Sequence, residues 1–393
     1  MKIVDLRTTL IAVPFKKPTY WPYGKWEGIS VVLVEIETDS GLVGLGESAC
    51  LPWPPEGCEI FLQGVKPLLL DESPFDTERI IKKIEGLGGW VFGRGYAGYA
   101  LGGIDMALWD LVGQAAGQPL YNLSGGRVRD GYKVMHYVPY DQPEKMAEEA
   151  AHHTALGFET IYLKYSDIKH LCRAVAAIRE AVGEEIDLWV DFNQTLSAGF
   201  AVSLLKRLEK YRLDIAEQPT LAGNLEELAH VRRHSAAKIL AHESSWNFYD
   251  AVNVVKAGAA DILSLEPRLS WGVAGCKKVA AIAEGAGLPV AMHSCAELGV
   301  AQACFAHVAV GLPNLVAASQ QMNDWFEDDY IVDKVPLQNG LITPPDKPGL
   351  GVAIDRDKVA EFHRNHRRTG GYSIAAVDRK NLALTPTPSW PSY

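Results

Sequence analysis

The chain has 393 residues, of which 48% are hydrophobic and 22% are charged. This length favours two domains over one hydrophobic core, and the composition excludes a disordered or fibrous protein. The formal net charge is −10 without a long basic run, which argues against a nucleic-acid partner, because such binding depends on Lys and Arg neutralising phosphates.

The first 130 residues have the pattern of an α+β domain. Apolar alternation predicts strands at residues 2–13 and 29–38, and the turn at 39–41 leads into a third strand at 42–47. Residues 59–123 have helical periodicity, which is clearest at 100–116. We therefore expect a β-meander followed by helices.

Residues 131–320 have a different sequence pattern, in which short runs of β-branched residues alternate with longer amphipathic stretches. The runs lie at 132–138, 160–164, 187–191, 214–217, 239–241, 261–265, 289–292 and 315–318. Repeated β-then-α units predict a parallel sheet, and eight strands with seven helices between them fit a closed barrel better than an open sheet. The predicted fold class is α/β, a modified TIM barrel of (β/α)7β type.

The pattern stops after residue 320, so residues 321–393 form a separate C-terminal segment. Short strand-like pieces occur at 331–354, and the tail from about residue 370 reads as extended. His363 and His366 fall on a helix rich in arginine, and we expect them on its solvated face.

Several features indicate a cytoplasmic protein without a membrane partner. The six cysteines form no CxxC pair and read as reduced thiols. Asp5 and Arg7 interrupt what would be the apolar core of an export signal, and no apolar run reaches the roughly 18–20 residues of a membrane span. A symmetric homo-oligomer is the expected assembly.

Three acidic residues each end a predicted strand. They are Asp191, Glu217 and Glu243. Successive members of this set are 26 residues apart, which is the length of one βα unit. Carboxyl ends of neighbouring barrel strands share one face, where three unpaired carboxylates would repel one another. A hard divalent cation resolves this repulsion, and all-oxygen ligands favour one Mg²⁺ per subunit, with Mn²⁺ as the alternative. Ordinary loop acids or helix caps are the competing interpretation.

Residues with acid–base chemistry end the flanking strands. Lys164 ends the strand before Asp191 and becomes a general base if nearby cations lower its pKa; otherwise it is a surface lysine. His293 ends the seventh strand, as a catalytic acid or base or as a buried hydrogen-bonded histidine. Glu266 ends the sixth strand, where it would orient the imidazole of His293 and raise its pKa. Such a site removes the proton α to a carboxylate through a metal-stabilised enediolate.

Several motifs resemble those of the mandelate racemase branch of the enolase superfamily, over nearly the whole chain. They are GLGE at 44–47, GIDMALWDLVGQAAGQPLYNLSGG at 103–126, VDFNQTL at 190–196, IAEQPT at 215–220 and PGLG at 348–351. The chemistry of a Lys or His base with Mg²⁺ is established for this superfamily. The resemblance implies an N-terminal capping domain completed by the C-terminal segment. It also matches Lys164 to the base, His293 to the catalytic histidine and Glu243 to the third metal ligand.

Three positions depart from that pattern. Tyr162 stands where the family has the first lysine of its KxK motif, Glu266 replaces the aspartate that pairs with the histidine, and Ser319 or Gln320 replaces a glutamate of the eighth strand. These departures argue against mandelate itself as the substrate. We expect Tyr162, Asn193 and Ser319 to contact the substrate.

The resemblance further implies two lid loops, at residues 15–26 and 50–57. They carry the aromatic residues Tyr20, Trp21, Tyr23, Trp26 and Trp53. An aromatic box suits a ring, the CH face of a sugar or a cationic nitrogen, although these side chains also suit packing on the neighbouring domain. Lys16, Lys17 and Lys25 can replace the cation lost at Tyr162.

The expected reaction is dehydration of an acid sugar or related hydroxy acid, a small-molecule carboxylate. Lys164 would take the α proton, and His293 would help the β-hydroxyl leave as water. Racemisation or epimerisation by the same two bases is the first alternative, cycloisomerisation the second, and a non-catalytic metal-binding protein the third.

Overall fold

The computed structural model describes residues 1–21, 24–49, 53–87, 95–165 and 167–372, and the side chains of residues 20, 21 and 25 lie outside that description. The chain begins with an antiparallel meander of β1 (Ile3–Trp21), β2 (Gly24–Thr38) and β3 (Val43–Ser48), as predicted. The first two strands extend further than expected, because a register shift between Pro14 and Thr19 lets the hairpin continue past the prolines.

Four helices follow this meander. They are α1 (Glu56–Leu69), α2 (Thr77–Leu87), α3 (Tyr96–Ala116) and α4 (Leu120–Leu123). Helix α3 packs so closely on β3 that a Cβ atom on Gly46 would lie 1.9 Å from the carbonyl oxygen of Gly103. Gly46, the second glycine of the GLGE motif, therefore lets the backbones of the helix and the sheet come into direct contact.

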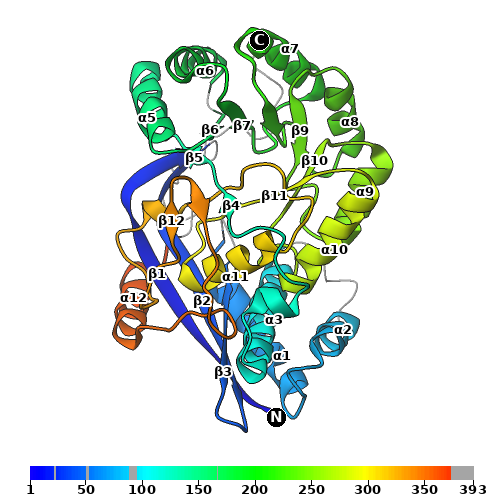
Figure 1. Cartoon of the computed structure of the whole chain (residues 1–393), viewed down its shortest axis with the longest axis vertical. Helices are drawn as coiled ribbons and strands as arrows, with labels where there is room; N and C mark the ends of the chain where they lie inside the picture. The colour runs from blue at the N-terminus through cyan, green and yellow to red at the C-terminus, as the bar shows by residue number, and fades with distance from the viewer. Residues whose placement is uncertain (22–23, 50–52, 88–94, 166, 373–393) are drawn as a thin grey trace.

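The second part of the chain forms a parallel sheet curled into a barrel (Figure 1). Its strands, in spatial order, are β5 (His136–Tyr137), β6 (Thr160–Lys164), β7 (Asp187–Asp191), β8 (Ile215–Glu217), β9 (Lys238–Ala241), β10 (Ile262–Leu265) and β11 (Val290–Met292). The helices between them are α5 (Pro143–Ala155), α6 (Ile168–Val182), α7 (Ala198–Leu208), α8 (Leu225–Arg233), α9 (Phe248–Ala257) and α10 (Gly272–Gly285), with α11 (Gly299–Val310) after β11. The predicted modified TIM barrel is confirmed.

The eighth barrel segment closes the ring without forming a regular strand. Leu315 forms a parallel bridge with Val290, and Ser319 forms one with Val134. The first predicted strand is also divided, because β4 (Tyr132–Lys133) turns away to pair with β13 (Leu341–Ile342), which in turn pairs with β12 (Leu337–Gln338). The barrel is thus continuous on seven strands, and the eighth segment joins its two edges by one bridge on each side.

The C-terminal segment returns to the N-terminal sheet, as the resemblance implied. Helix α12 (Arg356–Thr369) packs on β1, where the His363 ring lies with its Nδ1 2.8 Å from the Leu10 carbonyl oxygen. His366 is 4% exposed, and its Nε2 lies 3.0 Å from Glu56 Oε1. The expectation of a solvated face for these two histidines was wrong, because the arginines of α12 face solvent while the histidines cover the sheet. Of the extended tail predicted from about residue 370, residues 373–393 lie outside the described residues.

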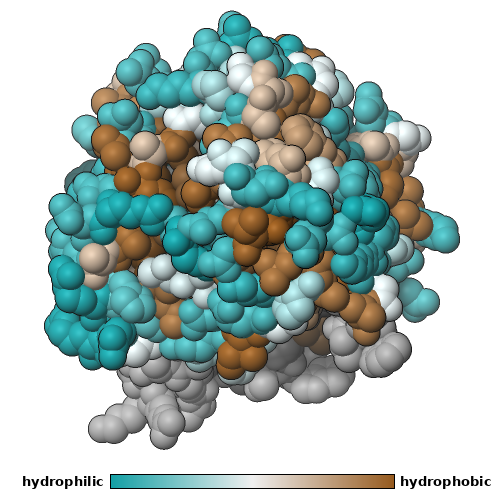
Figure 2. Space-filling model, turned by 90° about the horizontal axis from the view of Figure 1, so that it is seen from below, coloured by the Kyte–Doolittle hydropathy of each residue, from teal (hydrophilic) through white to brown (hydrophobic). Residues whose placement is uncertain are grey.

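Figure 2 shows one face, on which groups of hydrophobic residues are interspersed among hydrophilic ones. Within the described part of the chain, no helix is both long and apolar enough to cross a membrane.

Candidate active site

Strand register brings the predicted site residues to one end of the barrel. Lys164 pairs with Asp191 across β6 and β7, and Asp191 pairs with Glu217 across β7 and β8. Glu217 pairs in turn with Leu240 of β9, three residues before Glu243. Neighbouring strands are about 4.8 Å apart, so the regular spacing in the sequence becomes lateral adjacency at the carboxyl ends of four strands.

Asp191 is completely buried and accepts several hydrogen bonds. Its Oδ2 accepts from the hydroxyl of Tyr162 at 2.8 Å and from the ammonium group of Lys164. Its Oδ1 accepts from the backbone N–H of Asn193 at 2.8 Å, and the Asn193 amide lies 3.5 Å from Glu243 Oε1. Asn193 therefore links the first and third carboxylates, whereas Tyr162 is bonded to the first.

Glu217 is held from the barrel interior and from the closing segment. The indole N–H of Trp189 and the side-chain amide of Gln320 both donate to its Oε2 at 2.8 Å. The Ser319 hydroxyl instead accepts from the backbone N–H of Met292 at 3.1 Å. Of the two eighth-segment positions, Gln320 is the one whose side chain reaches a site carboxylate.

His242 is a site residue that the sequence analysis missed. Its Nδ1 lies 3.2 Å from Glu217 Oε1 and 3.3 Å from Glu243 Oε2, between two of the predicted ligands. Burial alone would lower its pKa, but Glu243 and Glu217 outweigh burial and raise it to about 10. A histidine directly before the third carboxylate was the available signal.

His293 lies beside this group, at the end of β11. Its Nδ1 donates to Glu266 Oε2 at 3.1 Å, and its ring stacks on that of His242 with centroids 3.6 Å apart. The Cys295 sulfur lies 3.4 Å from the same nitrogen. The predicted contact with Glu266 is present, but the predicted rise in pKa is wrong. Burial, followed by the charge of His242, holds the pKa of His293 well below its usual value.

Arg268 is a second residue that the sequence analysis missed, and it lies behind Glu266. Its fully buried guanidinium donates to Glu266 Oε1 at 3.0 Å and to Glu47 Oε1 at 3.4 Å, and it lies 3.7 Å from Glu297 Oε2. Glu47 belongs to the GLGE motif of β3 and also accepts from the Tyr330 hydroxyl at 2.6 Å. The ion-pair network thus joins the N-terminal sheet to the carboxylate that holds His293.

The carboxylates of the barrel mouth exceed the cations around them. Asp191, Glu217 and Glu243 are 0%, 0% and 8% exposed, and Lys164 is their one ordinary basic neighbour among the described residues. Burial alone would lower the pKa of Lys164, but Asp191 and Glu217 raise it instead. Three buried oxygen-donor side chains with surplus negative charge fit a hard divalent cation.

The predicted lid residues are described only in part. The side chains of Tyr20, Trp21 and Lys25 lie outside the described residues, as does the whole of Tyr23. Trp53 is 57% exposed. Trp26 is buried, in edge-to-face contact with Phe15 at 4.9 Å, so this residue packs internally.

Comparison with known proteins identifies the family. Residues 4–125 match "Mandelate racemase / muconate lactonizing enzyme, N-terminal domain", and residues 145–358 match "Enolase C-terminal domain-like". The N-succinyl-L-Arg/Lys racemase of Bacillus cereus is 27% identical over 92% of this chain and 98% of the relative, and its crystal structure superposes with a TM-score of 0.86. A D-galactonate dehydratase of Xanthomonas oryzae is 30% identical over 88% of this chain and 93% of the relative.

A third relative carries a metal. The dipeptide epimerase from Enterococcus faecalis, crystallised with Mg and L-Leu-L-Tyr, is 28% identical over 90% of this chain and 100% of that chain, with a TM-score of 0.82. The chain therefore belongs to the mandelate racemase/muconate lactonizing enzyme branch of the enolase superfamily, whose members use Mg²⁺. It is an enzyme of the lyase or isomerase class.

Proposed function

We propose that this enzyme removes the proton α to a substrate carboxylate with the help of Mg²⁺, and that it dehydrates an acid sugar or a related hydroxy acid. The observation that carries this proposal is the arrangement of Lys164 and His293 around one group of carboxylates. Lys164 comes from β6 and His293 from the end of β11, so a base and an acid reach the substrate from different strands.

The proposed metal ligands are Asp191, Glu217 and Glu243, for one Mg²⁺ or Mn²⁺ per subunit. When bound, the cation would supply positive charge where negative charge develops on the substrate carboxylate. Asn193, Trp189 and Gln320 would orient these ligands through the hydrogen bonds described above.

Lys164 is the proposed base. Its amine loses a proton more readily once the charge of Asp191 is neutralised, because the Asp191 carboxylate raises its pKa. The Nδ1–H group of His293 donates a hydrogen bond to Glu266. This hydrogen bond orients the imidazole so that its Nε2 would face the substrate. In its imidazolium form, His293 would also carry a proton at Nε2. It would pass this proton to the departing β-hydroxyl, which leaves as water, and would return to the neutral form.

The substrate would be held by Tyr162, Asn193 and Ser319 together with the lid residues Tyr20, Trp21, Lys25 and Trp53. The catalytic barrel would span residues 131–320, with a cap at 1–130 and a returning segment at 321–393. The contact of Arg356 in α12 with Glu35 in β2, at 2.6 Å, supports this division.

A racemase or epimerase is the second candidate, favoured by the similarity to the racemase of B. cereus and to the dipeptide epimerase. The same two bases would then act on opposite faces of the α carbon without a leaving group.

The test incubates the protein with Mg²⁺ in D₂O and a panel of sugar acids, hydroxy acids and N-acylated amino acids. A product lighter by one water supports the dehydratase, whereas deuterium gain with inversion supports the racemase. In a dehydratase, His293→Asn would retain α-deuterium exchange while losing at least about 100-fold in dehydration, the usual contribution of a general acid. Lys164→Ala would lose both activities.

The matched control is Lys238→Ala, which removes an exposed lysine at the start of β9, the opposite end of the barrel. Its activity should equal that of the parent. The catalytic proposal fails if Lys164→Ala retains the activity of the parent, and the dehydratase assignment fails if exchange occurs without loss of water.

A further inference from the structure

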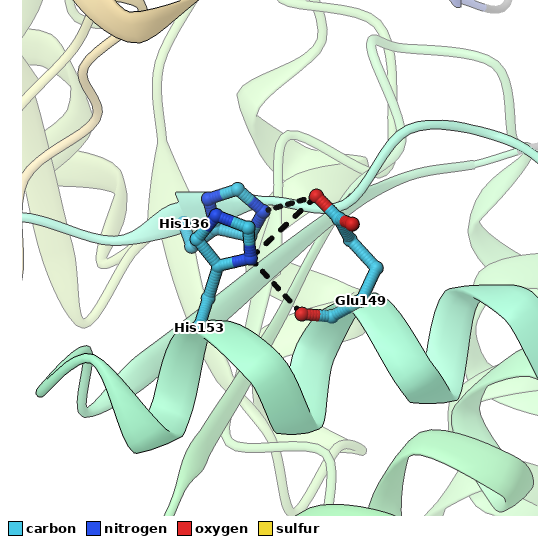
Figure 3. A group of neighbouring side chains, drawn as sticks. All are labelled: His136, Glu149 and His153. Carbon is cyan, nitrogen blue, oxygen red and sulfur yellow. Dashed lines mark hydrogen bonds and ion pairs between the residues drawn. The ribbon is translucent and has the colours of Figure 1, made fainter.

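A second group of metal-ligating side chains lies outside the barrel mouth. His136 belongs to β5, whereas Glu149 and His153 belong to α5, the helix after it (Figure 3). Tyr137 lies among the side chains that fill the barrel interior, so its neighbour His136 points outward. Glu149 and His153 are four residues apart and share one helix face, which places all three side chains in the layer between strand and helix.

Their ligand atoms converge on one point. His136 Nε2 lies 3.2 Å from Glu149 Oε1, and His153 Nδ1 lies 3.5 Å from the same oxygen. The two imidazoles stack with centroids 3.3 Å apart and planes inclined by 6°, and all three ligand atoms fall within 4.8 Å of one another. Ligands at the usual distance from a tetrahedral Zn²⁺ are roughly 3.3 Å apart, so the spacing of these atoms suits a shared cation. Because the two rings are nearly parallel, one imidazole would rotate to aim its lone pair at that cation.

We propose that His136, Glu149 and His153 form a second divalent-cation site, for a borderline metal of the Zn²⁺ class. Two imidazoles and one carboxylate select such a metal, whereas the all-carboxylate group of the barrel mouth selects Mg²⁺. His153 Nδ1 lies 3.0 Å from the backbone carbonyl oxygen of Glu149, and this nitrogen gives up its proton when it binds the cation.

The surroundings of the three ligands are those of a built site. His136 is 95% buried at its side chain, and Asp324 Oδ2 lies 4.0 Å from its Nδ1, on the side opposite Glu149. At 4.0 Å the Asp324 carboxylate makes no hydrogen bond to this nitrogen, but it stands on the side from which a carboxylate holds the tautomer that presents Nε2 to a metal. The Glu149 side chain is 42% exposed and leaves the fourth position to water.

The site has a structural consequence. It would fasten α5 to β5, because His136 belongs to the strand whereas Glu149 and His153 belong to the helix. The proposed cation is therefore a cross-link within the barrel, and it takes no part in the reaction at the mouth.

The test is a calorimetric titration of the metal-stripped full chain with Zn²⁺, in excess Mg²⁺ to occupy the barrel mouth. All samples carry His234→Gln, because the neighbouring, exposed rings of His230 and His234 would offer Zn²⁺ an adventitious site. We expect one further equivalent of Zn²⁺ to bind, and His136→Asn and His153→Gln to weaken its binding by at least about 10-fold. His152→Gln, which changes the exposed neighbouring histidine of α5, should bind as the parent does.

Glu149→Gln guards against a folding defect, since this side chain is partly exposed and the substitution keeps its shape. It should also weaken Zn²⁺ binding at least about 10-fold, with unchanged far-UV circular dichroism. The proposal is overturned if the parent binds no Zn²⁺ beyond the mouth. It is equally overturned if the additional equivalent survives in Glu149→Gln, or disappears in His152→Gln.

Discussion

Replacement of Arg268 by methionine is expected to destabilise the fold strongly and in a pH-dependent manner. The guanidinium is fully buried among Glu47, Glu266 and Glu297, so its removal leaves three buried carboxyls without their cation. Breaking a buried ion pair by removing one partner costs about 3–5 kcal/mol. That is a large part of the roughly 5–15 kcal/mol that stabilises a typical protein.

The pH dependence follows from the carboxyls that remain. Burial already raises the pKa of Glu297 to about 8 and raises that of Glu266, although Arg268 lowers both. A carboxyl with a raised pKa in the folded state stabilises the fold below its unfolded pKa, and this contribution is lost as pH rises through the folded pKa. Arg268→Met should raise the pKa values of these carboxyls further. Each additional pKa unit lowers the free energy of unfolding at high pH by about 1.4 kcal/mol more.

The assay is urea unfolding of parent and variant at pH 5 and pH 8.5. The loss in the free energy of unfolding should be larger at pH 8.5. Arg356→Met is the matched control. The Arg356 side chain that pairs with Glu35 is 59% exposed, although the Glu35 side chain is 5% exposed. Because water screens the guanidinium of Arg356, its loss should cost less than the loss of the fully buried Arg268. The reasoning is refuted if Arg268→Met costs no more than Arg356→Met, or if its cost is the same at both pH values.

Three further predictions concern close packing, a buried acid and the metal ligands. Gly46→Ala places a Cβ atom 1.9 Å from a backbone oxygen of α3 and should lower the free energy of unfolding by about 1–3 kcal/mol, whereas Gly64→Ala, with open space around its Cβ, should not lower the thermal midpoint. Burial raises the pKa of Asp105 to about 7, so between pH 4 and 7 the parent should lose up to about 1.4 kcal/mol per pH unit relative to Asp105→Asn in urea unfolding; parallel curves would contradict this. Trp189→Phe removes a hydrogen bond to Glu217 and should weaken Mg²⁺ binding about 10–100-fold by calorimetry, an expectation that unchanged affinity would exclude.

The sequence predicted the parts of the fold that depend on local pattern. Helix α6 spans residues 168–182, where the amphipathic stretch was expected, because both of its ends carry local signals: Asp167 accepts from the His170 N–H at the start, and Gly183 follows the end. The eighth barrel segment was predicted as a strand but forms bridges alone. Its residues have the composition of a strand, and the geometry of barrel closure decides how many of them pair.

The candidate site divides in the same way. Asp191 and Glu217 were predictable as neighbours, because the ends of strands and the βα repeats can be identified from the sequence alone. Arg268 was not, since its partner Glu47 lies 221 residues away, and only the docking of the N-terminal sheet on the barrel brings the two together. His242 directly precedes a predicted ligand in the sequence. Its contact with Glu217 and Glu243 depends on the direction of its side chain, which the spacing of residues in the sequence does not predict.

The two groups of buried carboxylates differ in the cations that surround them, which supports the proposed cation at one place and not at the other. Around Arg268, a permanent guanidinium with five N–H donors already supplies fixed positive charge to Glu47, Glu266 and Glu297. At the mouth, Lys164 is the one ordinary base that the described residues place beside the three carboxylates, and the His242 between two of them is driven toward its charged form. The raised pKa of His242 therefore marks a point at which neighbouring carboxylates favour positive charge. That point lies between Glu217 and Glu243, where a divalent cation would complete the charge balance that His242 meets only in part.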